Sequence, residues 1–273
     1  MVEPLMSISG NLSRTNRGRF FCVLTLGFIV LSMGPAALAQ FKFRKPPNRQ
    51  LPSALDERSG EFVWQQFLWN RAIGKFNLSG SLVYRPARDK SRSYSINLDA
   101  NWKTDSEETA ISLAGSLDDV IQRTVVVDED RKFFLRDSDC SQCLVELTRE
   151  EQQDSISDEL PITWFDLLMP YLYWGQPEYL GPERYIGRPA HRYALYNLDS
   201  DAGIQKVVVT LDEDYAAILK SDSFDVDDKL VKRMRVAGFK QFASEWMFSE
   251  LYWENRSTRD SLRLSVKTFS IGE

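Results

Sequence analysis

From about residue 74 onward, hydrophobic and polar residues alternate along much of the chain. Between Tyr94 and Trp102, apolar side chains at every second position are separated by serine, asparagine and aspartate. Side chains on a β-strand point to opposite faces in turn, so this period predicts strands with one apolar and one polar face. Turn-forming residues separate most of these segments, which predicts an antiparallel meander. The expected strands cover residues 76–84, 94–102, 111–117, 123–127, 132–135, 144–147, 179–186, 191–197, 206–212, 216–224, 230–239, 246–254 and 262–269.

A helical period replaces this alternation in residues 56–70. Phe62, Gln66 and Trp69 recur at helical spacing, and Val63 and Phe67 widen the same stripe. Such spacing is typical of an amphipathic helix that packs on a sheet through one face. We therefore expect the stripe through Phe62 to face the sheet.

Residues 161–174 are the densest apolar stretch of the chain that follows the N-terminal segment. Pro161 fits the first turn of a helix, where its missing N–H is not needed, and Pro170 would stop that helix. These two prolines predict a short helix over residues 161–169.

Many strands with few helices predict a mainly β (α+β) fold. The expected architecture is a curved antiparallel sheet, or open half-barrel, whose concave face is covered by a few short helices. An incompletely filled concave face would bind an apolar ligand by burying its surface, at about 25 cal/mol per Å². Alternatively, tryptophan and phenylalanine side chains fill the space, as in the core of a sandwich.

The N-terminal segment has the three parts of an export signal in order. Arg14, Arg17 and Arg19 precede an apolar run over residues 20–33, and Ala-Leu-Ala ends at Ala39. This order predicts export to the periplasm and cleavage after Ala39. The alternative is that the run is retained as a membrane anchor. We expect residues 1–39 to be the signal, 40–54 a flexible basic lead-in, and 55–273 one domain.

The balance of charge limits the partners of the chain. Its formal net charge is -5. Without residues 1–39 the chain keeps 31 basic and 38 acidic residues, a net charge of -7. An acidic chain gives no reason to expect binding to nucleic acid.

Few residues have the chemistry for catalysis. His191 is the only histidine, and no G-x-S-x-G motif is present, so a nucleophilic relay is not supported. We expect His191 to be exposed at a strand end. Cys140 and Cys143 form a C-x-x-C pair that an oxidising compartment would convert to a short disulfide. Two cysteines and one histidine are too few for a closed zinc site. We therefore expect no enzyme activity, metal or cofactor.

Several short motifs follow one another between residues 164 and 195. They are Trp164-Phe-Asp-Leu-Leu, Tyr171-Leu-Tyr-Trp, Tyr179-Leu-Gly-Pro-Glu, Gly187-Arg-Pro and Tyr193-Ala-Leu. This order, and the strand pattern after it, resembles the outer-membrane lipoprotein-sorting (LolA-like) superfamily. The resemblance covers roughly residues 55–270.

The resemblance implies an open β half-barrel that carries the acyl chains of lipoproteins or other lipids across the periplasm, without cofactor or catalysis. It implies exchange with an inner-membrane donor or an outer-membrane acceptor. The lid would correspond to residues 56–70 and 161–169. The residues expected to line the cavity or lid are Phe62, Leu98, Trp102, Trp164, Phe165, Leu168, Leu172 and Trp174.

Three other functions fit parts of the pattern. The first is an interaction module of the same fold that senses lipid or lipoprotein. The second is an outer-membrane β-barrel, since export and alternation also fit that class. The third is a hydrolase, for which the sequence offers the least support.

Overall fold

The computed structural model describes residues 57–69, 74–102, 106–115, 120–136, 143–157, 160–198, 203–242 and 245–272. The predicted signal, the basic lead-in and Cys140 lie outside these ranges. Cys143 is disulfide-bonded, and its pairing with Cys140 stays a prediction. Within the described ranges, neither helix combines the length and the hydrophobicity needed to cross a bilayer.

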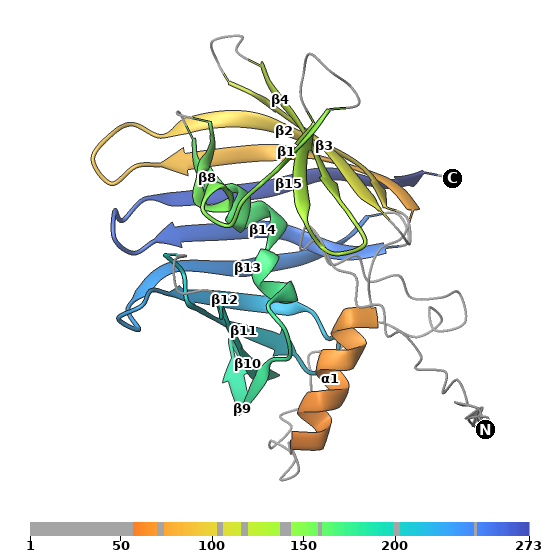
Figure 1. Ribbon diagram of the computed structural model, residues 1–273, viewed down its shortest axis with the longest axis vertical. Helices are drawn as coiled ribbons and strands as arrows, with labels where there is room; N and C mark the ends of the chain where they lie inside the picture. The colour runs from red at the N-terminus through yellow and green to blue at the C-terminus, as the bar shows by residue number, and fades with distance from the viewer. Residues whose placement is uncertain are drawn as a thin grey trace, which may run out of the picture.

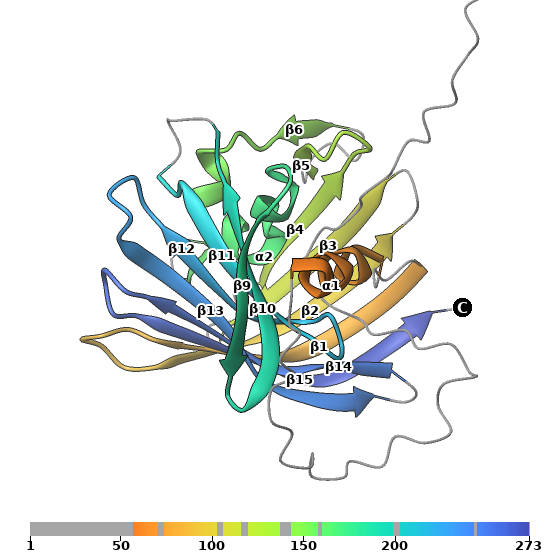
Figure 2. The same cartoon turned by 90° about the horizontal axis from the view of Figure 1, so that it is seen from below.

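In the part of the chain that the structure describes, thirteen strands form one antiparallel sheet, in the order β6-β5-β4-β3-β2-β1-β15-β14-β13-β12-β11-β10-β9. The sheet curves strongly and does not close, because β6 and β9 remain its two edges (Figures 1 and 2). The first group of strands is β1 (Gly74–Arg85), β2 (Arg92–Trp102), β3 (Glu107–Ala114), β4 (Val120–Val127), β5 (Phe133–Arg136) and β6 (Leu144–Glu146). The second is β9 (Glu178–Tyr185), β10 (Arg188–Tyr196), β11 (Lys206–Asp212), β12 (Ile218–Phe224), β13 (Leu230–Phe242), β14 (Glu245–Asn255) and β15 (Ser261–Gly272).

Pairing between β1 and β15 joins the two groups. Leu82 lies opposite Leu264, and Ser81 lies opposite Ser265. Both leucines have no exposed surface, whereas the serines belong to the other face. The alternation in the sequence therefore corresponds to one apolar and one polar face of the sheet. The predicted mainly β fold with a curved, open sheet is confirmed.

The chain crosses from edge β6 to edge β9 through the concave side of the sheet. This crossing contains η1 (Glu151–Gln153), the hairpin of β7 (Ser155–Ser157) and β8 (Leu160–Thr163), α2 (Trp164–Leu168) and η2 (Pro170–Tyr173). Figure 2 shows α2 within the curve of the sheet, and α1 (Glu57–Trp69) close to β9 and β10. The predicted covering of the concave face by short helices is confirmed.

The second helix begins later than the sequence predicted. Pro161 lies in β8, and Thr163 caps α2 instead. The Thr163 hydroxyl accepts a hydrogen bond from the Asp166 N–H, and the Asp166 carboxylate accepts one from the Thr163 N–H. This reciprocal box satisfies two backbone donors, so the helix starts where the box places it. Met169 ends α2 in the left-handed conformation, with φ of 45°.

Candidate functional site

The concave face is apolar where α2 lies against it. Leu78, Leu82 and Leu98 have no exposed surface. Trp102 is 2% exposed, and its indole N–H donates a 3.0 Å hydrogen bond to the hydroxyl of Thr109. Leu98 and Trp102, two of the predicted site residues, therefore lie in the buried core of this face.

A segment that we call the plug, residues 164–174, fills the centre of the concave side. It consists of α2, Met169 and η2, and it ends at Trp174. Trp164, Phe165, Leu168 and Leu172 are buried in the core, and Trp174 is partly buried against it. The sequence therefore located the plug residues, although the helix within them is shorter than expected.

Aromatic contacts and one hydroxyl contact hold the plug. The ring centroid of Phe165 lies 5.4 Å from that of Tyr171 and 5.9 Å from that of Trp174. The Tyr171 hydroxyl donates a long 3.4 Å hydrogen bond to the hydroxyl of Ser221 on β12. Burial raises the pKa of Tyr171 well above its usual range, because desolvation disfavours the phenolate. The two aromatic contacts therefore hold the plug together internally, and the Tyr171 hydroxyl joins it to β12.

One ion pair fixes the start of the plug to β13. The Lys232 ammonium lies 2.9 Å from the Asp166 carboxylate and 3.1 Å from the Thr163 hydroxyl. The side chain of Asp166 is 9% exposed and that of Lys232 is 22% exposed. Lys232 thus binds both members of the capping box, and it ties the first turn of α2 to the sheet.

Two small hollows flank this ion pair. One has a volume of about 30 Å³ and lies toward β14 and β15. The other has a volume of about 10 Å³ and lies toward β12 and β13. A water needs roughly 10–15 Å³ of such space, so neither hollow holds an acyl chain with the plug seated. Besides Asp166 and Lys232, the larger hollow is lined by Pro161, Ile162, Trp253, Glu254, Asn255, Asp260, Ser261 and Leu262.

The first helix packs closely on β9 and β10. The Tyr193 hydroxyl donates a 2.6 Å hydrogen bond to the carbonyl of Gly60. A Cβ at Gly60 would lie 2.4 Å from a ring carbon of Tyr179, so this approach needs glycine. The ring of Trp64 lies 5.1 Å from that of Tyr193. The buried face of α1 is therefore the one that contains Gly60 and Trp64.

The prediction that the stripe through Phe62 faces the sheet is wrong. Val63 and Phe67 are buried, but Phe62 is 68% exposed and Trp69 is 80% exposed. The contact of Gly60 with Tyr179 sets the rotation of the helix, and this contact cannot be read from local spacing. Phe62 thus lies outside the concave face, unlike the other predicted site residues.

His191 is buried rather than exposed, so the expectation of an exposed strand-end histidine is wrong. It has no exposed surface, because it lies on an inner strand beneath Tyr179. Its Nδ1 lies 2.9 Å from the Tyr179 hydroxyl, and its Nε2 has no hydrogen-bond partner among the described residues. Burial lowers the pKa of His191, since the charged imidazolium would lose its solvation. Within the described ranges, no group of three or more histidine, cysteine, aspartate and glutamate residues is placed to hold a metal ion.

Sequence reasoning missed the polar anchor of the plug. In the sequence, Lys232 is one of several charged residues on the same strand. Met234 and Val236, at the next alternate positions, belong to the buried core. Since alternate residues of a strand share one face, this pattern could have indicated that Lys232 faces inward. The Thr163-x-x-Asp166 spacing was a second signal, because it matches a helix-capping box.

No model of a protein family matches this chain. No curated protein matches it either. Solved structures do match.

A domain from Vibrio parahaemolyticus, named an outer membrane lipoprotein-sorting protein domain, is 15% identical to this chain and matches its structure with a TM-score of 0.66. The match covers 79% of this chain and 93% of that domain. A DUF1329 family protein from Desulfovibrio piger is 11% identical with a TM-score of 0.62, over 78% of this chain and 92% of the other. A LolA superfamily protein from Nitrosomonas europaea is 11% identical with a TM-score of 0.58, over 78% and 94%. These likenesses show that the chain has a LolA-like fold.

Proposed function

We propose that this protein is a carrier, without catalytic activity, that binds lipid or lipoprotein acyl chains between the plug and the concave face of its sheet. One observation supports the proposal above the others. A thirteen-stranded curved sheet has an apolar concave face, and a five-residue helix followed by a 3-10 turn covers its centre. A second sheet would make such a core permanent, whereas a short plug can leave it.

The chemistry of the plug contacts also supports exchange with an acyl chain. Phe165, Leu168 and Leu172 contribute apolar surface to the core. An acyl chain that replaced them would bury similar apolar surface at a similar gain, about 25 cal/mol per Å². The exchange would thus change the free energy little, apart from the Asp166–Lys232 pair. A carrier that must both load and release its cargo needs this near balance.

The hollow of about 30 Å³ beside Lys232 is the proposed entry point. Ile162, Trp253 and Leu262 give it apolar walls, and Asp166 with Lys232 closes its inner side. Movement of α2 away from β13 would enlarge this hollow toward the centre of the sheet. The proposed site thus comprises the plug, Leu98 and Trp102, and it omits Phe62.

The proposed location is the periplasm, which the chain would reach by the export signal at residues 1–39. An inner-membrane donor and an outer-membrane acceptor are the proposed partners in exchange. The function requires neither a metal nor a cofactor.

Lipid retention by the exported protein tests the proposal. Native mass spectrometry of the protein recovered from its own cells should detect co-purifying lipid or lipoprotein. Uptake of a fluorescent long-chain fatty acid should saturate at one or a few molecules per chain. Absence of both bound lipid and probe uptake, with a stable protein partner instead, would favour the sensing module.

A charged substitution at the end of the plug locates the site. Trp174 is partly buried, so Trp174→Glu should weaken probe uptake more than it lowers the free energy of unfolding. Leu198→Glu is the control, because Leu198 is 89% exposed and outside the core. Equal uptake by both variants and the wild type would place any lipid elsewhere.

A further inference from the structure

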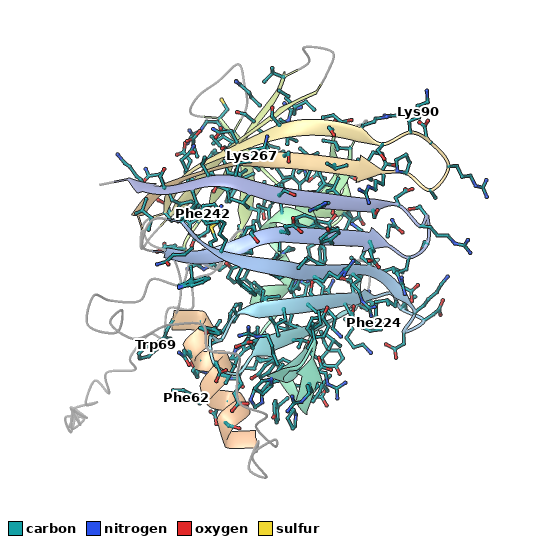
Figure 3. All side chains as sticks on the ribbon, turned by 180° about the vertical axis from the view of Figure 1, so that it is seen from behind. Phe62, Trp69, Lys90, Phe224, Phe242 and Lys267 are labelled. Atoms are coloured by element: carbon teal, nitrogen blue, oxygen red, sulfur yellow. The ribbon has the colours of Figure 1, made fainter. Side chains whose placement is uncertain are left out.

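The outward face of α1 carries two large aromatic side chains. Trp69 is 80% exposed and Phe62 is 68% exposed, more than any other aromatic side chain that the structure describes. Figure 3 shows both on the side of α1 that faces away from the sheet. They are seven residues apart, so they share one face of the helix about 10 Å apart. Glu61 and Gln65 are exposed beside them.

This face is not needed to hold α1 in place. The opposite face already contacts the sheet through Gly60, Val63, Trp64 and Phe67. The second apolar patch, on the opposite side of the helix, is therefore exposed for a contact outside the described fold.

The size of the face argues against a stable protein partner. A standard protein–protein interface buries roughly 800 Å² on each side. Two aromatic side chains, each of roughly 150–250 Å² when fully buried, provide at most about 500 Å² of this area. The same two side chains suffice for the interfacial layer of a bilayer, where tryptophan and phenylalanine are favoured.

The charge of the adjoining sequence indicates which bilayer. Residues 40–55 contain Lys42, Arg44, Lys45 and Arg49 and no acidic residue, and Asp56 and Glu57 follow them, the latter at the start of the helix. They contrast with the net charge of -5 for the whole chain. Each basic residue close to an anionic lipid surface adds to the attraction, within about a Debye length. The basic stretch and the aromatic pair are therefore complementary to the headgroups and to the outer acyl layer, respectively.

We propose that the outer face of α1 docks on the surface of an anionic lipid bilayer through Phe62 and Trp69. The inner face of the same helix covers β9 and β10, so docking places this end of the sheet against lipid. The proposal concerns a surface that is separate from the plug, and it does not depend on which cargo the concave face carries.

Vesicle binding by the protein recovered after export tests the proposal. The wild type should co-sediment with vesicles of phosphatidylglycerol and phosphatidylcholine, less with pure phosphatidylcholine, and less at high salt. Phe62→Ser with Trp69→Ser should lower the partition coefficient by about tenfold or more. The control pair is Ile186→Ser with Val226→Ser, because these turn residues are 75% and 78% exposed. Loss of binding in the control pair alone would overturn the proposal.

Trp69 itself provides a second readout, which holds even if residues 1–39 tether the chain to vesicles. Lipids brominated near the headgroup should quench the part of the fluorescence that Trp69→Phe removes. Failure to quench this part, or equal partition of the double variant and the wild type, would refute docking. A dimer that the double variant abolishes would also refute it, since the face would then bind a second copy. Fatty-acid uptake should stay unchanged in the double variant, so this test and the carrier test can fail separately.

Discussion

Lys232→Met is the perturbation that most directly tests whether the plug is a gate. The change keeps the length and apolar stem of the side chain but removes its ammonium group. Asp166, whose side chain is 9% exposed, then loses the 2.9 Å contact that neutralises its charge. The Thr163 N–H and hydroxyl still bond to the carboxylate, at 3.0 and 2.8 Å. The capping box therefore survives, and the loss falls on the contact between plug and sheet.

The size of the effect follows from the burial of the pair. A hydrogen bond to a charged group contributes about 1.5–3 kcal/mol, so a loss of about 2 kcal/mol is expected. If this loss acts on the seated plug, the population with the plug displaced rises by about 30-fold. The apparent affinity for a fluorescent fatty acid should rise by up to the same factor, while the free energy of unfolding falls by about 2 kcal/mol.

The assay combines urea unfolding with probe titration on the same samples. Lys267→Met is the matched control, since Lys267 is exposed on β15. Lys232→Met with Asp166→Asn should recover part of the stability, because no charge then remains unpaired. A Lys232→Met protein that loses stability without any gain in probe affinity would refute the gate.

Three further outcomes are expected. Burial lowers the pKa of His191 below 6.5 in the folded state, so the neutral side chain contributes its full stability above pH 6.5 and this stability is lost as the pH falls through the folded pKa. The urea midpoints of His191→Gln at pH 5 and at pH 7.5 should therefore lie closer together than those of the wild type, and an unchanged difference would assign the acid sensitivity to another group. Gly60→Ala places a Cβ 2.4 Å from the ring of Tyr179. The free energy of unfolding should therefore fall by about 1–3 kcal/mol, and the melting temperature with it, despite the higher helix propensity of alanine. Leu168→Ala should cost about 2–5 kcal/mol in urea unfolding, because Leu168 has no exposed surface and its loss leaves a cavity; a cost below about 1 kcal/mol would mean that the plug is already loosely packed.

The sequence was most informative where structure depends on local alternation. The strand over 94–102 was predicted within two residues, and its apolar positions lie in the core, as Leu98 and Trp102 show. A period of two needs no knowledge of distant residues, because the pleat alone assigns the faces. The plug was located for a similar reason, since its apolar density is a local property.

The sequence was least informative where a distant contact decides between local options. Phe62 and Trp69 pointed to one stripe of α1, whereas the structure buries the stripe of Val63, Trp64 and Phe67, beside the fit of Gly60 against Tyr179. His191 is buried because Tyr179 on β9 covers it, a pairing that spacing does not specify. The role of Lys232 depends on Asp166, 66 residues away. Such contacts are properties of the folded sheet rather than of a window of sequence.

The route of the chain between the two edges has a mechanical consequence. A single covalent stretch leaves the sheet at β6, forms the plug and rejoins the sheet at β9. A displacement of α2 from the sheet must therefore be accommodated by the segments that join the plug to β6 and to β9. The curvature of the sheet and the seating of the plug are thus linked through the connectivity of one chain segment.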